Sequence, residues 1–249
     1  MKTMKATKTM KATKTAGGVL LALAILGLGV VSCTDMEGAA SFAITGSLAV
    51  TQQEQCMARA NAQRYRFRGT LDTWMRNRYY LYPVLQSYLV STRDFGPLYG
   101  ENHTIQILGA HVSFTYPANL DAATKALLSE TYFTNATGTV FPMQPGVGEV
   151  MVIPPEVGNA LAAEPFTRAS GFEIVAHVRI EGQLMDGTIV QTNEYQFPID
   201  ICWGCLYLIV SDDCSQYQEA QDMKPPCRIG QDEGVDCRLF ALWGWGEPN

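Results

Sequence analysis

The feature that most restricts the fold is a pair of segments in which every second residue is apolar. Residues 173–181 and 195–201 both show this spacing, with Val175 as an exception in the first. Successive side chains of a strand point to opposite faces of a sheet, so the spacing predicts two strands that each bury one face. Asp186-Gly187 lies between them and is a strong hairpin turn signal. Proline cannot donate to a β-ladder, so Pro198 predicts that the second strand is exposed at an edge.

Several other segments have the spacing or the composition of strands. The alternation within 105–116 changes phase at Gly109, which predicts a β-bulge there. Pro83 lies inside an aromatic segment and argues for an edge strand or a bulge. The segments in this group are 42–50, 64–67, 78–90, 105–116 and 206–210.

Two segments are typical of short helices. Residues 119–130 combine a capping residue with good helix formers, and a second helix is expected from Pro154 to Ala163. Many short strands with turn signals and little helix predict a mostly β fold. We interpret it as a β-sandwich with an immunoglobulin-like topology and short helical connections, although the Cys…Trp…Cys spacing of antibody domains is absent from the sequence.

The amino-terminal segment has the pattern of an export signal. Residues 1–15 contain five lysines and no acidic residue, and 17–31 form an apolar run. A basic region before a short apolar region is typical of a secretory signal peptide. The apolar run is about 15 residues, whereas a spanning helix needs about 20, so we favour a cleaved signal over a retained anchor helix.

The end of this segment identifies a lipidation site. Val30-Val31-Ser32-Cys33 resembles the lipobox of bacterial lipoproteins. The resemblance implies that residues 1–32 are removed, that Cys33 is acylated, and that 33–40 form a tether. Two or three acyl chains anchor a protein stably to a membrane. Thr34, rather than aspartate, follows the cysteine, and by the same resemblance this favours the outer over the inner membrane.

The charge of the chain restricts its partners. The precursor has a formal net charge of −6, and removal of the leader with its five lysines makes the mature chain more acidic, at −11. An acidic protein is a poor candidate for binding nucleic acid. A local group of arginines is interpreted as the solvated faces of strands, with an anion-binding strip as the alternative. Its members are Arg64, Arg66, Arg68, Arg76 and Arg78.

Six cysteines remain after the lipidated one. An even number beyond an export signal predicts three disulfides, and the sequence does not choose among the 15 possible connectivities. We expect residues 41–211 to form the β domain, and 212–249 to form a cysteine-containing tail packed on it. The disulfide candidates are Cys56, Cys202, Cys205, Cys214, Cys227 and Cys237.

The motif Cys202-Trp203-Gly204-Cys205 raises the question of redox chemistry. Redox-active CxxC motifs begin a helix, whereas the segment after Cys205 favours a strand. On a strand the two cysteines would lie about 10 Å apart, too far for a disulfide. We therefore expect each to pair with a distant partner, unless Gly204 allows a turn. A zinc site is disfavoured because only one CxxC is present.

The cysteine-containing tail has a further resemblance. Gly204–Leu206, Pro226-Cys227 and Gly230–Cys237 are similar to segments of uncharacterised cysteine-rich bacterial lipoproteins. The resemblance also includes the upstream segment Arg78–Leu85. It supports the class of protein and implies no activity.

Catalytic and metal-binding patterns are weak. The sequence has no GxSxG motif, and its three histidines are His103, His111 and His177. His177 alternates with apolar neighbours and is interpreted as a surface residue, although catalytic triads are spatial and a hydrolase stays possible. A group of acidic residues is interpreted as a solvated loop rather than a calcium site. These residues are Asp212, Asp213, Asp232, Glu233 and Asp236.

These observations predict a lipid-anchored envelope protein without enzymatic activity. We expect it to bind a protein or a glycan, or to act structurally, with no cofactor, no metal and no catalytic residue. One alternative is a carbohydrate-binding module that uses exposed aromatic rings; a third hypothesis is thiol redox chemistry at Cys202 and Cys205. The candidate rings are Trp74, Tyr79, Tyr80, Trp243 and Trp245.

Overall fold

The structure, a computed structural model of the chain, describes residues 41–91, 101–209, 214 and 223–243. The predicted signal peptide, Cys33 and the tether lie outside these residues. Within them, no helix combines the length and the hydrophobicity needed to span a bilayer.

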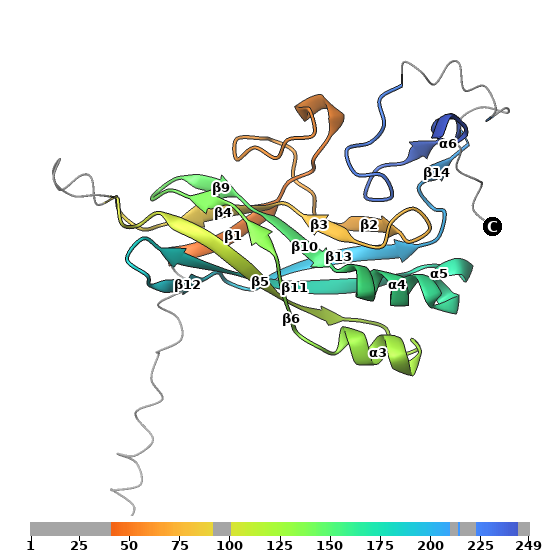
Figure 1. Cartoon of the computed structure of the whole chain (residues 1–249), viewed down its shortest axis with the longest axis horizontal. Coiled ribbons are helices and arrows are strands. Elements are labelled where there is room, and N and C mark those ends of the chain that lie inside the picture. Colours follow the sequence, from red (N-terminus) through yellow and green to blue (C-terminus); the bar gives the residue numbers. More distant parts are fainter. Residues whose placement is uncertain (1–40, 92–100, 210–213, 215–222, 244–249) are drawn as a thin grey trace, which may run out of the picture. The chain divides into compact units, whose positions relative to one another are not determined.

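The largest sheet has seven strands and curls into a half-barrel. Five strands follow the order β2-β13-β11-β5-β6, while β12 pairs with β11 and β8 pairs with β5 (Figure 1). The strands are β2 (Gly69–Asp72), β5 (Ile105–Thr115), β6 (Tyr132–Thr134), β8 (Thr139–Val140), β11 (Phe172–Leu184), β12 (Ile189–Gln191) and β13 (Tyr195–Cys202).

The two alternating segments form neighbouring antiparallel strands, as predicted. β11 pairs with β13 from Phe172↔Ile201 to Val178↔Tyr195, and Gly187 makes the turn into β12 with a φ of 92°. The prediction of an exposed edge at Pro198 holds for only part of the strand, because the end of β13 also pairs in parallel with β2. That parallel pairing begins only at Ile199. Pro198 therefore lies just outside it, where a missing N–H costs no ladder bond.

The predicted bulge at Gly109 is confirmed. Glu181 of β11 faces Gly109, and the next residue, Gly182, faces Ile107. Leu108 is thus the extra residue on β5, which is the definition of a β-bulge.

Two smaller sheets are joined end to end. Leu81 pairs with Val150 in one sheet, and Val84 pairs with Val147 in the other, so a single antiparallel ladder continues through a break at Tyr82. The sheet orders are β1-β4-β9 and β3-β10-β7. The strands are β1 (Phe42–Ser47), β3 (Tyr79–Leu81), β4 (Pro83–Ser87), β7 (Ala136–Thr137), β9 (Pro145–Val147) and β10 (Glu149–Ile153).

Pro83 does not mark an edge strand. β4 lies between β1 and β9, and Pro83 is its first residue, a position that strands allow to proline. The register irregularity nearby belongs to the facing strand, between Ile44 and Gly46. The expected strand over 64–67 is reduced to an isolated bridge between Tyr65 and Leu48.

One hydrophobic core joins the large sheet to the smaller ones. Phe42 and Leu85 of the small sheets and Ile174 and Phe197 of the large sheet belong to the same cluster and are fully buried. Burying a side chain of this size contributes about 1.5–3 kcal/mol. The mostly β fold with packed sheets is confirmed, while the immunoglobulin-like topology stays a prediction.

Short helices connect the strands. The two predicted ones are present as α3 (Ala122–Leu128) and α4 (Pro155–Ala163). The Asp121 carboxylate caps α3 by accepting from the Thr124 N–H at 2.7 Å. A further helix that was not predicted, α5 (Pro165–Ala169), follows α4, and η1 (Gln52–Glu54) is a single 3₁₀ turn.

The described part of the predicted tail contacts the residues before it. Its strand β15 (Val235–Asp236) pairs in parallel with β14 (Tyr207–Leu208), and α6 (Cys237–Trp243) follows. Phe240 contacts the Trp74 ring at 5.3 Å between centroids, inside a second, smaller hydrophobic cluster.

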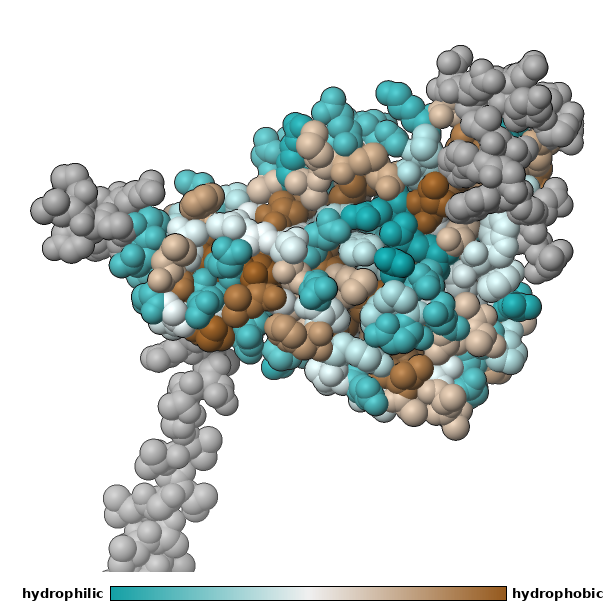
Figure 2. Space-filling model, in the orientation of Figure 1, coloured by the Kyte–Doolittle hydropathy of each residue, from teal (hydrophilic) through white to brown (hydrophobic). Residues whose placement is uncertain are grey.

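On the face of the molecule shown in Figure 2, small groups of hydrophobic residues lie among hydrophilic residues.

A buried carboxylate also holds the tail. Asp232 accepts hydrogen bonds from the Tyr79 hydroxyl at 2.9 Å and from the Thr70 N–H at 2.9 Å. The Nε of Arg66 lies 3.5 Å from the same carboxylate, whose side chain is only 12% exposed. The interpretation of Asp232 as part of a solvated acidic loop is therefore wrong: it is a buried link between the tail and the β domain.

Candidate functional site

The CWGC motif forms a disulfide of its own. Cys202 is the last residue of β13, and its sulfur is bonded to that of Cys205, with 5.9 Å between the two Cα atoms. The prediction of distant partners is wrong because the chain does not continue as a strand. It turns at Gly204, whose φ of 71° is readily available to glycine.

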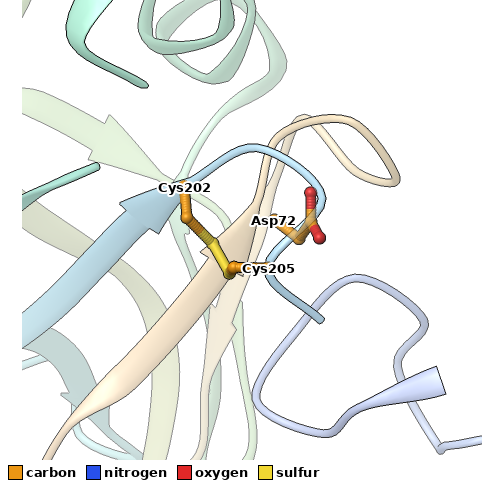
Figure 3. Close-up of side chains that lie close together, drawn as sticks. All are labelled: Asp72, Cys202 and Cys205. Carbon is orange, nitrogen blue, oxygen red and sulfur yellow. A yellow bond between two sulfur atoms is a disulfide. The ribbon is translucent and has the colours of Figure 1, made fainter. Parts of the chain in front are cut away.

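A carboxylate from another strand organises this turn. Asp72, the last residue of β2, accepts hydrogen bonds from the N–H groups of Gly204 at 2.8 Å, Leu206 at 2.9 Å and Trp74 at 3.1 Å. Figure 3 shows the chain between and beyond the two cysteines passing around this carboxylate. The Thr73 N–H and hydroxyl both donate to the Cys202 carbonyl at 2.8 Å. The conformation of the turn therefore rests on hydrogen bonds that do not involve the sulfurs.

Burial and hydrogen bonding act in opposite directions on the pKa of Asp72. The side chain is fully buried, and this burial raises the pKa of Asp72, against the opposing effect of its N–H donors. The carboxylate oxygen and the two sulfurs lie within 4.8 Å of one another. A buried carboxyl group thus lies beside the sulfur pair.

The two sulfurs differ in accessibility. Cys205 is exposed, whereas Cys202 is half-buried at the end of β13. Trp203, between them, has the Arg168 guanidinium over its ring at 4.2 Å. An incoming thiolate can therefore reach Cys205 more easily than Cys202.

The zinc interpretation gains no support from this geometry. Asp72, Cys202 and Cys205 are the only group of three or more metal-type ligands among the described residues, and a structural zinc site needs four. The two sulfurs are bonded to each other, so they are not thiolates.

The other four cysteines also pair, so the prediction of three disulfides is confirmed. Cys56 bonds Cys227, and Cys214 bonds Cys237. The sequence separation is 171 for Cys56–Cys227, 23 for Cys214–Cys237 and 3 for the CWGC disulfide. In the chain-entropy model these loops correspond to about 5, about 3 and about 2 kcal/mol of stabilisation. The CWGC disulfide therefore contributes least to the fold.

A second candidate site is a groove of about 380 Å³ on the outer face of the large sheet. Alternation places its residues on the face opposite the core. Every lining side chain is polar, and Phe133 lies at the rim, 57% exposed and 4.9 Å from the His111 ring. The lining residues are His111, Ser113, Thr131, His177, Arg179, Gln191 and Glu194.

The hydrogen bonds of the groove centre on His177. Its Nε2 lies 2.8 Å from the Thr115 hydroxyl and its Nδ1 lies 3.0 Å from Glu194. Arg179 donates to the other oxygen of Glu194 at 3.1 Å. The hydrogen bond with His177 is the main reason why the pKa of Glu194 is lowered.

This arrangement places a hydroxyl, an imidazole and a carboxylate in the order of a catalytic triad. The sequence analysis missed it, because the three residues lie far apart in the chain and match no motif. Hydrolysis of an acyl group also needs backbone N–H groups aimed at the developing oxyanion. The strands that carry Thr115 and His177 pair with each other. Their backbone N–H groups are therefore used in the hydrogen bonds of the sheet. The groove therefore presents side-chain hydrogen-bonding groups without backbone N–H donors from these two strands.

The three candidate rings that the structure describes do not form a shared exposed platform. Tyr79 is buried, and Trp74 packs against Phe240 and Tyr207. The Tyr80 ring has the Arg228 guanidinium 4.5 Å from its centroid. The Trp243 side chain and Trp245 lie outside the described residues. The exposed ring that does lie beside the polar groove is Phe133, and no sequence signal distinguished it.

Three of the five arginines in the predicted group contact acidic or aromatic side chains. Arg68 pairs with Asp200 and, at 2.9 Å, with Glu173, Arg66 pairs with Asp232, and the Arg76 guanidinium lies 5.6 Å from the centroid of the Tyr80 ring. The acidic residues that the structure describes do not share one loop site. Asp236 instead accepts from Arg238, while Asp212 and Asp213 lie outside the described residues.

The chain matches no family model, and comparisons with curated proteins and with solved structures find no similar protein. The resemblances to bacterial lipoproteins therefore stay predictions.

Proposed function

We propose that the chain is a lipid-anchored protein of the bacterial cell envelope, whose β domain binds a ligand without transforming it. The leader and lipobox support the anchor, with the outer membrane as the favoured location. The three disulfides support export, because such bonds persist in oxidising compartments.

The observation that carries the binding function is the polar groove with Phe133 at its rim. Strand-borne side chains that already hydrogen-bond one another are held in place, so they lose little freedom on binding. Imidazole, guanidinium, hydroxyl, amide and carboxylate groups can both donate to and accept from a hydroxylated ligand. An exposed ring beside them can cover the apolar face of a sugar. We therefore propose a glycan as the ligand, with a protein partner as the alternative.

The anchor is tested with the Cys33→Ser variant. We expect wild-type protein to remain with membranes and to release an amino-terminal peptide that begins at an acylated Cys33. The variant should lose both properties, because a single thiol carries the acyl attachment. Membrane fractionation with peptide mass spectrometry makes the measurement. An unmodified Cys33 in membrane-bound wild-type protein would contradict the anchor.

The groove is tested with Glu194→Gln. This change removes the charge that both His177 and Arg179 contact, and we expect glycan affinity to fall about tenfold or more. Binding is measured by titration calorimetry on the extracted protein, with the glycan chosen from an array.

Glu173→Gln is the matched control, since Glu173 lies on the same strand and face as His177 and Arg179 but does not line the groove. Equal loss in both variants, or an array without a bound glycan, would remove the glycan proposal. Release of hydrolysed ligand would show that the groove is an active site instead.

A further inference from the structure

We propose that the Cys202–Cys205 disulfide is a redox-active centre that accepts two electrons from the exposed dithiol of an exported protein. Cys205 is the sulfur that is attacked, Cys202 is the leaving sulfur, and Asp72 is a positioning residue. This activity is independent of the groove and of its ligand.

The first argument is that this disulfide is not needed to hold the turn. Asp72 fixes the N–H groups of Gly204 and Leu206, Thr73 fixes the Cys202 carbonyl, and β2 pairs with β13 up to Cys202. Opening a bridge between residues three apart frees little chain. Reduction can therefore occur without unfolding.

The second argument is the asymmetry of the pair. Cys205 is exposed on the turn and open to an incoming thiolate, while Cys202 is half-buried. Sγ of Cys202 lies 3.5 Å from the Leu71 carbonyl oxygen. Once reduced and protonated, Cys202 can donate its S–H to that acceptor.

The thiol–disulfide exchange takes place in two steps. A thiolate of the partner attacks Sγ of Cys205, so that a mixed disulfide forms, the Cys202–Cys205 bond breaks and its electron pair leaves on Cys202. The second thiolate of the partner then attacks its own sulfur in the mixed disulfide and releases Cys205. The partner dithiol is oxidised to a disulfide, and its two electrons and two protons end on Cys202 and Cys205.

Asp72 assists by keeping the two sulfurs together after reduction. Because its hydrogen bonds fix the turn, the reduced thiols remain close, and ring closure is an intramolecular reaction between positioned groups. The buried carboxyl, whose pKa is raised by burial, can also exchange a proton beside them.

The experiment begins with the mature protein carrying all three disulfides and uses dithiothreitol as the dithiol. Samples are quenched with an alkylating reagent at increasing times and mapped by peptide mass spectrometry. We expect Cys202 and Cys205 to become alkylated about tenfold faster than Cys56 and Cys227, with an unchanged circular dichroism spectrum, and to re-form their bond in oxidised glutathione.

The Cys56–Cys227 disulfide is a suitable control because Cys56 is also exposed. If the CWGC disulfide is reduced no faster than this one, or if its reduction unfolds the domain, the proposal is overturned.

Single variants test the direction of attack. Cys202→Ser leaves the exposed thiol and should form a mixed disulfide with glutathione about tenfold faster than Cys205→Ser, which leaves the half-buried one. Equal rates would overturn the assignment of Cys205.

Asp72→Asn tests positioning. It should slow re-formation of the CWGC disulfide while leaving the reduction rate of Cys56–Cys227 unchanged, and an unchanged re-formation rate would overturn that role. Glycan binding is also measured with the cysteine variants. This measurement shows whether the redox activity is independent of the groove.

Discussion

Replacing both Cys56 and Cys227 by serine is expected to lower the free energy of unfolding by about 3–5 kcal/mol. The bond closes a loop with a sequence separation of 171, the longest of the three, and joins the segment after η1 to the tail. Its loss frees the largest amount of chain in the unfolded state. Urea denaturation of the oxidised proteins, followed by circular dichroism, gives the change.

The matched control is the double variant Cys202→Ser/Cys205→Ser, which removes a disulfide with a separation of only 3. It should lose at most about 2 kcal/mol. If the two double variants were destabilised equally, loop length would not explain the contribution of these bonds.

Replacing Asp232 by alanine is expected to cost about 3–5 kcal/mol of unfolding free energy. The carboxylate is the shared acceptor of Tyr79 and Thr70 and the charge partner of Arg66, whose side chain is 21% exposed. Its removal takes away the ion-pair partner of a largely buried cation. Thermal and urea unfolding measure the loss.

Two variants identify the cause of this loss. Asp232→Asn keeps the shape and tolerates the positive φ of 68° at this position, so it should lose less than the alanine variant. Asp186→Ala removes an exposed carboxylate on the hairpin turn and should change stability far less. If Asp186→Ala were as damaging as Asp232→Ala, burial of the carboxylate would not be the cause.

Asp232 also predicts a pH dependence. Burial is the main cause that raises the pKa of Asp232, so the folded state binds this proton more tightly than the unfolded state. The resulting stability is fully present below the unfolded pKa and is lost as the pH rises through the folded pKa. Between acid and neutral pH, the wild-type unfolding free energy should therefore fall relative to that of Asp232→Asn. Parallel curves for the two proteins would contradict this.

Local patterns sufficed where the determinants of structure lie within a few residues. Alternation located β11 and β13, the phase change at Gly109 located the bulge, and a capping residue located α3. Each depends on which side chains face the core or cap a helix end, and this information is local.

Local patterns failed where the deciding group is distant in the chain. The CWGC turn depends on Asp72, and the burial of Asp232 depends on Tyr79 and Thr70. The sequence also did not reveal that β2 covers the end of β13 from Ile199 onward, because β2 lies far upstream. The groove likewise unites side chains from separate strands and loops, and no spacing rule connects them.

The Cys56–Cys227 bond has a mechanical consequence. A pull applied between the amino-terminal end and the tail reaches residue 56 and can cross directly to residue 227. The intervening chain, which contains the large sheet, forms a closed covalent ring that lies off the path of tension. A protein tethered at one end and loaded at the other would then bear force through a sulfur–sulfur bond, and the hydrogen-bonded strands within the ring would be spared from unzipping.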